Sequence, residues 1–143
     1  MRRTTEERSG EFLTEFVGLW DVRRVIVDHR ADAVYHFAGR LQLTEDAFAE
    51  TGKLRMPRGT VAAERAYRLH SADSRLDVLF SDGRPFVTLG ARASQAVRHD
   101  CGADLYLGRI ICRSTNDWAE YWRVAGPAKR YASFCRYRRA AGG

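Results

Sequence analysis

The stretch RLDVLFSDGRPFVTL, residues 75–89, predicts two short strands joined by a tight turn. Residues 75–80 and 85–89 are rich in branched and aromatic side chains, and the Asp82-Gly83 dipeptide between them is a strong signal for a β-hairpin. Similar short runs, separated by turns, continue on both sides of this hairpin. The stretch therefore indicates an all-β fold built from neighbouring antiparallel strands.

Apolar and polar residues alternate along most of the remaining chain with the two-residue period of a β-strand. In residues 33–44, for example, Tyr35, Phe37, Leu41 and Leu43 fall on one face. The other expected strands cover residues 19–28, 48–56, 62–70, 96–101, 103–113, 118–125 and 129–138.

Only the N-terminal segment has helical spacing. Phe12, Leu13, Phe16 and Val17 share one helical face, and Gly18 supplies a stop signal, which predicts a helix over about residues 8–17. The face that carries Phe12 and Phe16 is expected to pack over one open end of the β-structure.

So many short strands in 143 residues need a sandwich or a closed barrel, because open sheet edges promote aggregation. Strands in up-and-down order close most simply into a barrel. We therefore expect residues 1–143 to form a single domain. Its strands, over about residues 19–139, would form an antiparallel up-and-down β-barrel of eight to ten strands.

Composition narrows the class of protein. The chain has 24 Lys and Arg residues against 18 Asp and Glu residues, a net charge of +6, but the basic residues are scattered and cluster only in RYRRAAGG at residues 136–143. This pattern does not favour nucleic-acid binding. There is no apolar run long enough for a membrane helix and no secretory signal, so a cytoplasmic location is expected. A small-molecule ligand is the expected partner, bound by a monomer or a homodimer.

The three cysteines form no CxxC pair. In a chain without an export signal they indicate small, partly buried apolar side chains rather than a disulfide framework.

A set of bulky polar residues alternates with the positions expected to face outward. Barrels of about eight strands can enclose a ligand cavity, whose wall combines aromatic side chains with a few polar groups. These residues are therefore candidates for ligand binding inside the barrel, or they are ordinary solvent-facing residues. The set comprises Arg24, Arg40, Glu50, Arg65, Tyr67, Tyr106, Trp122 and Tyr131.

The segment HDCGADLY, residues 99–106, carries the strongest candidates for chemistry. His99 can act as a general acid or base, with Asp104 orienting it across the turn at Gly102 and Tyr106 donating a hydrogen bond to an oxyanion. Alternatively, Asp104 caps the turn. Gly108 on the same face would leave room for a ligand beside Tyr106.

A metal site at His99, Cys101 and Asp104 is a minor alternative, because zinc sites need three or four converging ligands. Haem bound by His99 is another. No second cluster of His or Cys exists in the sequence to complete a site, so no metal or cofactor is predicted. The remaining histidines stand alone at His29, His36 and His70.

The turn at Gly126-Pro127 precedes Lys129. If the turn folds over the barrel mouth, Lys129, Trp122 and Tyr131 form a cationic and aromatic rim suited to an anionic planar ligand. Otherwise Lys129 is simply solvated.

The opening GLWDVRRVIVD, residues 18–28, resembles the glycine–x–tryptophan start of the calycins, the group of lipocalins and fatty-acid-binding proteins. In that group the tryptophan closes one barrel end against a basic residue of the last strand. The resemblance implies that Trp20 meets Arg136 or Arg138.

More specifically, the chain resembles the family of unknown function DUF6314. The resemblance implies a calycin-like barrel and transfers no activity. The family commonly has His after the Phe of DGRPF, where this chain has Val87. Besides Gly18–Trp20 with Arg23 and Asp28, the resemblance is carried by FAETGKL, ERAYRL, VLFSDGRPF, HDCGADLYLGRI, WRVAGPAKRY and YRR.

Three functions stay open. The first is a carrier or sensor that binds a small apolar or aromatic, anionic molecule inside the barrel. The second is a barrel enzyme that isomerises, cyclises or hydrolyses such a ligand with His99 as acid or base. The third is a module that contacts nucleic acid or protein through its basic surface.

Overall fold

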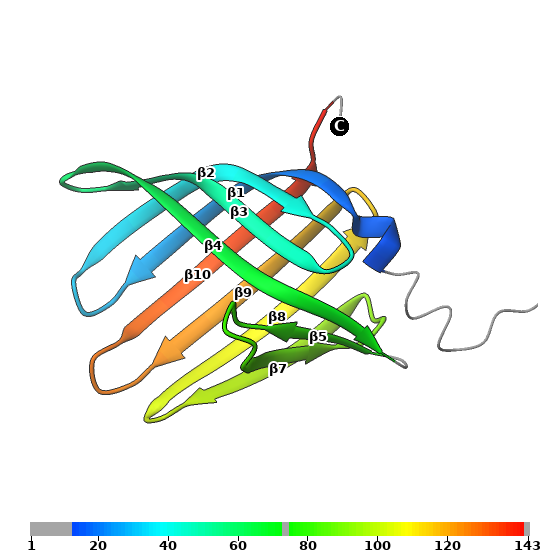
Figure 1. Cartoon of the computed structure of the whole chain (residues 1–143). Coiled ribbons are helices and arrows are strands. Elements are labelled where there is room, and N and C mark those ends of the chain that lie inside the picture. The colour runs from blue at the N-terminus through cyan, green and yellow to red at the C-terminus, as the bar shows by residue number, and fades with distance from the viewer. Residues whose placement is uncertain (1–12, 73–74, 142–143) are drawn as a thin grey trace, which may run out of the picture.

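The computed structural model describes residues 13–72 and 75–141. Its strands form one antiparallel sheet in the order β6-β5-β4-β3-β2-β1-β10-β9-β8-β7, which is an up-and-down, nearly closed barrel (Figure 1). The predicted all-β fold is therefore confirmed. The strands are β1 (Gly18–Asp28), β2 (Ala33–Leu43), β3 (Ala47–Met56), β4 (Gly59–Ala72), β5 (Arg75–Leu79), β6 (Pro85–Leu89), β7 (Ser94–Cys101), β8 (Asp104–Ser114), β9 (Asp117–Ala125) and β10 (Arg130–Arg139).

The barrel is closed on one side by the first and last strands. β1 pairs with β10 from Trp20–Arg139 to Asp28–Tyr131. The two ends of the sheet, β6 and β7, do not pair as strands, although they lie next to each other. We call the line between β6 and β7 the seam.

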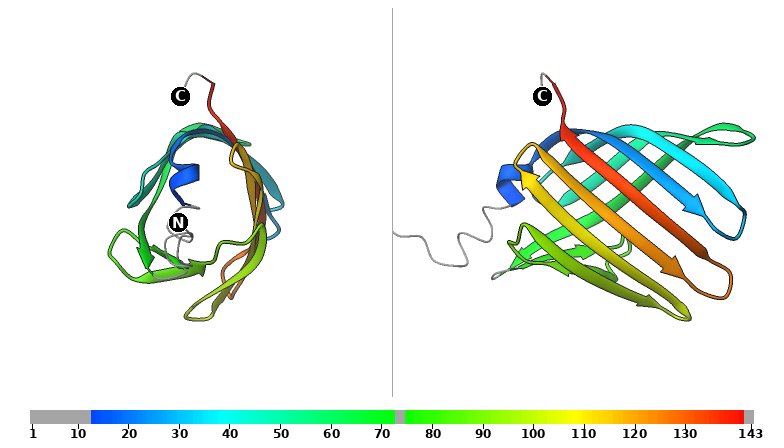
Figure 2. Two further views of the ribbon diagram at one scale, coloured as in Figure 1. Left: turned by 90° about the vertical axis from the view of Figure 1, so that its right-hand side faces the viewer. Right: turned by 180° about the vertical axis from the view of Figure 1, so that it is seen from behind.

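A short helix at residues 13–16 lies at one end of the barrel (Figure 2). The expected helix was longer, about residues 8–17, but residues 8–12, including Phe12, lie outside the described residues. The Phe16 ring stacks on Trp20 at 6.0 Å between centroids, and the Trp20 indole donates a hydrogen bond to the Phe16 backbone oxygen. The helix therefore closes this end, as expected for Phe16.

Trp20 is fully buried, and its basic partner is Arg139, whose guanidinium carbon lies 4.4 Å from the ring centroid. The prediction of Arg136 or Arg138 was wrong. Even-numbered residues of β10 face outward, where Arg136 binds Asp117. Arg139 is the cross-strand neighbour of Trp20 and shares its face, a register that the sequence alone does not give.

Alternation separates the core from the surface along each strand. The interior contains apolar side chains such as Val22, Leu41 and Cys135, all fully buried. Arg40, one of the interior candidates, faces outward instead: its side chain is 63% exposed and pairs with Asp21.

No helix among the described residues is long and apolar enough to cross a bilayer.

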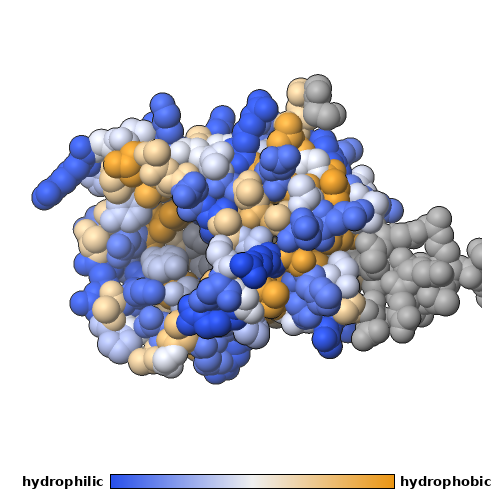
Figure 3. Space-filling model, in the orientation of Figure 1, coloured by the Kyte–Doolittle hydropathy of each residue, from blue (hydrophilic) through white to orange (hydrophobic). Residues whose placement is uncertain are grey.

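Hydrophilic residues cover much of the face shown in Figure 3. A hollow below the β3–β4 hairpin, at the barrel end opposite the helix, exposes hydrophobic residues. The barrel therefore has one end closed by the helix and one end that is more open.

Candidate functional site

A group of charged side chains crosses the barrel interior. Arg24 binds Glu50 at 2.7 Å between side-chain atoms, and Arg65 binds Glu120. Longer pairs join Arg24 to Glu120 at 3.7 Å and Arg65 to Glu50 at 3.5 Å. Together with Tyr137 we call these residues the charge cluster. Its two arginines and two glutamates balance, so the cluster adds no net charge to the interior.

Tyr137 links the two halves of this cluster. Its hydroxyl accepts a hydrogen bond from Arg65 at 2.8 Å, and lies 2.8 Å from a Glu120 oxygen and 3.1 Å from a Glu50 oxygen, to which its proton can be donated. Burial, together with Glu120, raises the pKa of the Tyr137 phenol well above its usual value. The phenol therefore stays neutral.

The cluster also fixes the ionisation of its members. Burial alone would raise the pKa of Glu120, but Arg65 and Arg24 outweigh it and lower the pKa below its ordinary value. Burial alone would lower the pKa of Arg24, yet its hydrogen bond with Glu50 leaves that pKa raised. At neutral pH Glu120 is therefore a carboxylate and Arg24 is protonated, which suits a structural network better than a proton donor.

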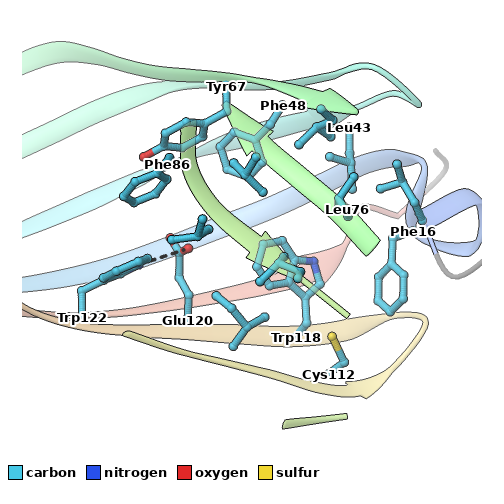
Figure 4. A pocket seen from close by; sticks show the side chains of 16 residues that line it. Phe16, Leu43, Phe48, Tyr67, Leu76, Phe86, Cys112, Trp118, Glu120 and Trp122 are labelled. Atoms are coloured by element: carbon cyan, nitrogen blue, oxygen red, sulfur yellow. Dashed lines mark hydrogen bonds between the residues drawn. The ribbon is translucent and has the colours of Figure 1, made fainter. Parts of the chain in front are cut away.

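Next to the charge cluster, on the helix side, lies an apolar pocket with a cavity of about 120 Å³. Figure 4 shows it with Phe16 at one end and with Tyr67, Phe86 and Trp122 at the other. The lining residues are Leu13, Phe16, Leu43, Phe48, Tyr67, Leu69, Leu76, Val78, Phe86, Val87, Leu89, Ile110, Cys112, Trp118, Glu120 and Trp122.

Three aromatic rings form a stack at the inner end of the pocket. Phe86 lies between Tyr67 and Trp122, at centroid distances of 5.2 and 5.3 Å and interplanar angles of 7° and 24°. The indole of Trp122 points its nitrogen at Glu120, 3.5 Å away. A side chain at Gly108 would meet the Trp122 ring at 2.8 Å. Gly108 therefore makes room for Trp122, not for a ligand beside Tyr106 as expected.

The pocket wall carries a hydrogen-bond donor that has no acceptor among the described residues. This donor is the indole nitrogen of Trp118, a residue whose ring stacks flat on Tyr137 at 3.7 Å. Among the described residues, a second buried side-chain donor also lacks an acceptor. It is the Arg65 Nε atom, which lies beside the rings of Phe48 and Tyr67. An unpaired buried donor costs about 1–3 kcal/mol, so an acceptor on a bound molecule would be favourable here.

His99 lies outside this pocket. With Tyr106 it lines a second hollow near the seam, together with Phe80, Arg84 and Phe86. The predicted cluster of His99, Tyr106, Tyr67, Arg65 and Tyr131 around one pocket was therefore wrong, because only Tyr67 lines the apolar pocket.

His99 is held by the opposite edge of the seam. Its Nδ1 donates a hydrogen bond of 3.1 Å to the Phe86 backbone oxygen, and its ring meets Phe80, Phe86 and Tyr106 edge-on. A carbonyl can only accept, so Nδ1 carries the proton in this contact. His99 thus joins β7 to β6.

Asp104 does not orient His99. Its carboxylate lies 3.6 Å from Lys129, whose ammonium donates to the Tyr106 hydroxyl at 3.0 Å. The oxygen of Tyr106 raises the pKa of Lys129. Tyr131 is half-buried, and burial and nearby Tyr106 raise its pKa. Tyr106 near the start of β8, and Lys129 and Tyr131 around the start of β10, lie at the barrel end away from the helix (Figure 1) and do not line the apolar pocket.

Among residues 13–72 and 75–141, no three His, Cys, Asp or Glu side chains gather in a way that could hold a metal ion. His99 and Cys101 lie on one strand, but Cys101 is exposed and Asp104 pairs with Lys129.

Arg24, Glu50 and Arg65 were separate candidates for the wall of a ligand cavity. In the structure they lie together in the charge cluster with Glu120 and Tyr137, a pairing that was not predicted. Strand alternation was the available signal for both additions. Glu120 lies midway between Trp118 and Trp122, and Tyr137 follows Cys135 by two positions. Phe86 and Trp118 were missed because an aromatic residue in a strand usually belongs to an ordinary core.

The sequence model of the family of unknown function DUF6314 matches residues 16–139. The chain belongs to this family. No curated protein matches it. Val87, which follows the Phe of DGRPF in this DUF6314 barrel, lines the apolar pocket.

Two solved structures are similar to the DUF6314 barrel. The S-type phycobiliprotein lyase CPES from Guillardia theta has a TM-score of 0.64 and 9% identity, with 99% of this chain and 100% of that chain covered. A DUF3598 protein of unknown function from Nostoc punctiforme has a TM-score of 0.59 and 10% identity, with 90% of this chain and 49% of that chain covered. These likenesses show a shared calycin-like barrel.

Proposed function

We propose that the DUF6314 barrel binds a small apolar or aromatic molecule in the apolar pocket, as a carrier or sensor. The observation that carries this proposal is the pocket of about 120 Å³, whose wall is apolar apart from a few groups and includes the unpaired Trp118 indole nitrogen. An engineered apolar cavity of about 150 Å³ is known to bind benzene, so a single ring is of suitable size.

The fold supports the same proposal. Barrels of this size hold small molecules between aromatic walls. The similar barrel from Guillardia theta is named as a phycobiliprotein lyase, and at 9% identity it supports the barrel and not a particular ligand or reaction.

An anionic ligand stays a prediction from the sequence. Arg24 and Arg65 are both paired with carboxylates, and Lys129 lies beside Asp104. An anion would therefore compete with carboxylates that are already in place, which favours a neutral ligand with a hydrogen-bond acceptor for Trp118.

Binding is favoured over catalysis by His99. The His99 ring donates to a backbone oxygen and touches aromatic rings, whereas the carboxylate of Asp104 is engaged by Lys129. An enzyme that used His99 would lose most of its turnover in His99→Phe, while a carrier would keep its ligand with at most a small change in affinity.

Benzene titration followed by NMR tests the proposal, with the full chain at neutral pH. We expect saturable shifts for side chains of the pocket, among them Leu76 and Ile110. Cys112→Phe, which places a ring in the pocket wall, serves as the matched control and should abolish these shifts while the fold is retained. Absence of saturable shifts in the unmodified protein, or equal binding by Cys112→Phe, would refute the proposal.

A further inference from the structure

The pocket is small for a barrel that binds a natural ligand. Its cavity of about 120 Å³ accommodates roughly one ring, whereas ligand pockets commonly measure about 300–1,000 Å³. A larger ligand therefore needs one of the side chains that fill the barrel to leave its place.

Phe86 is the side chain whose position resembles that of a bound flat molecule. Its ring lies nearly parallel to Tyr67 on one side and to Trp122 on the other, at centroid distances of 5.2 and 5.3 Å. The three rings come from β6, β4 and β9, so the two outer rings belong to separate parts of the wall (Figure 4). Offset parallel stacking on both faces is how aromatic side chains hold a planar ring.

The two outer rings are fixed by their own contacts. Trp122 fits against Gly108, where an added Cβ would come within 2.8 Å of the indole ring, and its indole nitrogen faces Glu120. Tyr67 packs against Phe48 and the guanidinium of Arg65. Both walls of the slot would therefore keep their places if Phe86 moved.

Phe86 itself belongs to the least connected part of the wall. Its strand β6 has five residues and pairs only with β5, since β6 and β7 are the two ends of the sheet. Across the seam, His99 donates to the Phe86 backbone oxygen. Gln95 exchanges two hydrogen bonds with the Gly90 backbone, at 2.8 and 2.9 Å. Few hydrogen bonds therefore hold β6 to β7 across the seam, whereas β5 stays paired with β4 from Arg68–Leu79 to Ala72–Arg75. The seam edge of β6 can move outward while β5 keeps its place in the wall.

We propose that the space of Phe86 between Tyr67 and Trp122 is the binding slot for a planar ligand of two or three fused rings, which enters through the seam and displaces Phe86. This inference rests on the proposed function and adds the shape of the ligand and its route. A ring nitrogen or carbonyl on the ligand would supply an acceptor for the Trp118 indole nitrogen, the unpaired donor of the pocket wall.

Equilibrium dialysis with two probes tests the slot. Benzene reports on the pocket as it stands, and acridine in its neutral form is a flat three-ring probe with one acceptor nitrogen. In Phe86→Ala, acridine needs no displacement of a ring, so its affinity should rise at least tenfold over the unmodified protein, while benzene should still bind. Phe80→Ala is the matched control, because Phe80 lies in the same β5–β6 connection and touches Phe86 but is not between the two walls. It should change acridine affinity less than threefold.

The outcomes separate the slot from the pocket. If benzene binds but Phe86→Ala does not tighten acridine, or if Phe80→Ala tightens it equally, the slot is refuted and the proposed function stands. If neither probe binds any variant, the proposed function fails as well. If circular dichroism shows that Phe86→Ala does not fold, Phe86→Leu takes its place in the test. A folded Phe86→Leu variant that binds acridine no more tightly than the unmodified protein would refute the proposed slot.

Discussion

Neighbouring strands of the barrel wall are joined in very different ways at the β1–β10 pair and at the β6–β7 seam. β1 and β10 share a continuous ladder, with Trp20 buried beneath it. β6 and β7 meet through the contacts of His99 with Phe86 and of Gln95 with Gly90. Local opening costs less where few bonds hold an element. The difference gives the barrel one firm side and one side that can admit a ligand.

The largest effect is expected on the firm side. Trp20→Ala removes a fully buried indole that stacks on Phe16 and makes a cation–π contact with Arg139. The free energy of unfolding should fall by roughly 3–5 kcal/mol, the usual cost of a large core truncation. A denaturant melt measures this change. A loss below about 1 kcal/mol would show that Trp20 does not hold the barrel end together.

The charge cluster should give the next largest effect. Glu120→Gln leaves Arg65 with a weaker partner, and because 26% of the Arg65 side chain remains accessible, we expect the low end of the range for a broken buried pair, about 3 kcal/mol. Urea melts of the variant at pH 7 check this. A variant as stable as the unmodified protein would mean that the cluster contributes little.

The same carboxylate predicts a pH dependence. The pKa of Glu120 is lowered in the folded protein, so its contribution to stability is complete above the ordinary value of 4.5 and is lost as the pH falls through the folded pKa. Melts between pH 7 and pH 3 should show this acid loss, and Glu120→Gln should make it shallower. If both proteins lost the same amount of stability between pH 7 and pH 3, the loss could not be attributed to Glu120.

The seam should respond locally. His99→Phe keeps a ring among Phe80, Phe86 and Tyr106 but removes the hydrogen bond across the seam, which contributes about 0.5–1.5 kcal/mol. Native-state hydrogen exchange should become faster in β5 and β6 and stay unchanged in β1 and β10. Arg98→Ala, on the exposed face of the same strand, is the control. Equal acceleration in β1 would show that the seam is no weaker than the rest of the wall.

The smallest effect belongs to the outer surface. Arg40 pairs with Asp21 at 3.6 Å, and both side chains are more than half exposed. Such pairs contribute little, so Arg40→Ala should change the free energy of unfolding by less than about 0.5 kcal/mol in a urea melt. A loss near that of Glu120→Gln would mean that Arg40 supports the wall in a way that its exposure does not indicate.

Strand alternation was enough to predict the barrel, because the two-residue period needs no knowledge of which strands meet. It gave Arg24, Glu50 and Arg65 as candidates for the interior, with a solvent-facing position left open as the alternative, and it wrongly included Arg40, which faces outward. The same period places Glu120 and Tyr137 inside, but a lone acidic or phenolic residue gives no sign in the sequence that its partners lie on distant strands.

The register of the strands and the position of the seam could not be predicted from the sequence. Choosing Arg139 over Arg136 for Trp20 requires the exact pairing of β1 with β10. The place of His99 depends on where the sheet ends, since it faces β6 across the seam rather than a closed wall. A one-residue change in pairing would move each side chain to the other face.

The crystal structure of the protein soaked with benzene tests most directly whether the interior of the barrel is the binding site. We expect density for one benzene molecule in the apolar pocket, in contact with Leu76 and Trp118, and with the β1–β10 pair unchanged. Density only on the outer face, for example beside the exposed pair of Tyr121 and Phe134, or none in a crystal of a protein that binds benzene in solution, would contradict ligand binding inside the barrel.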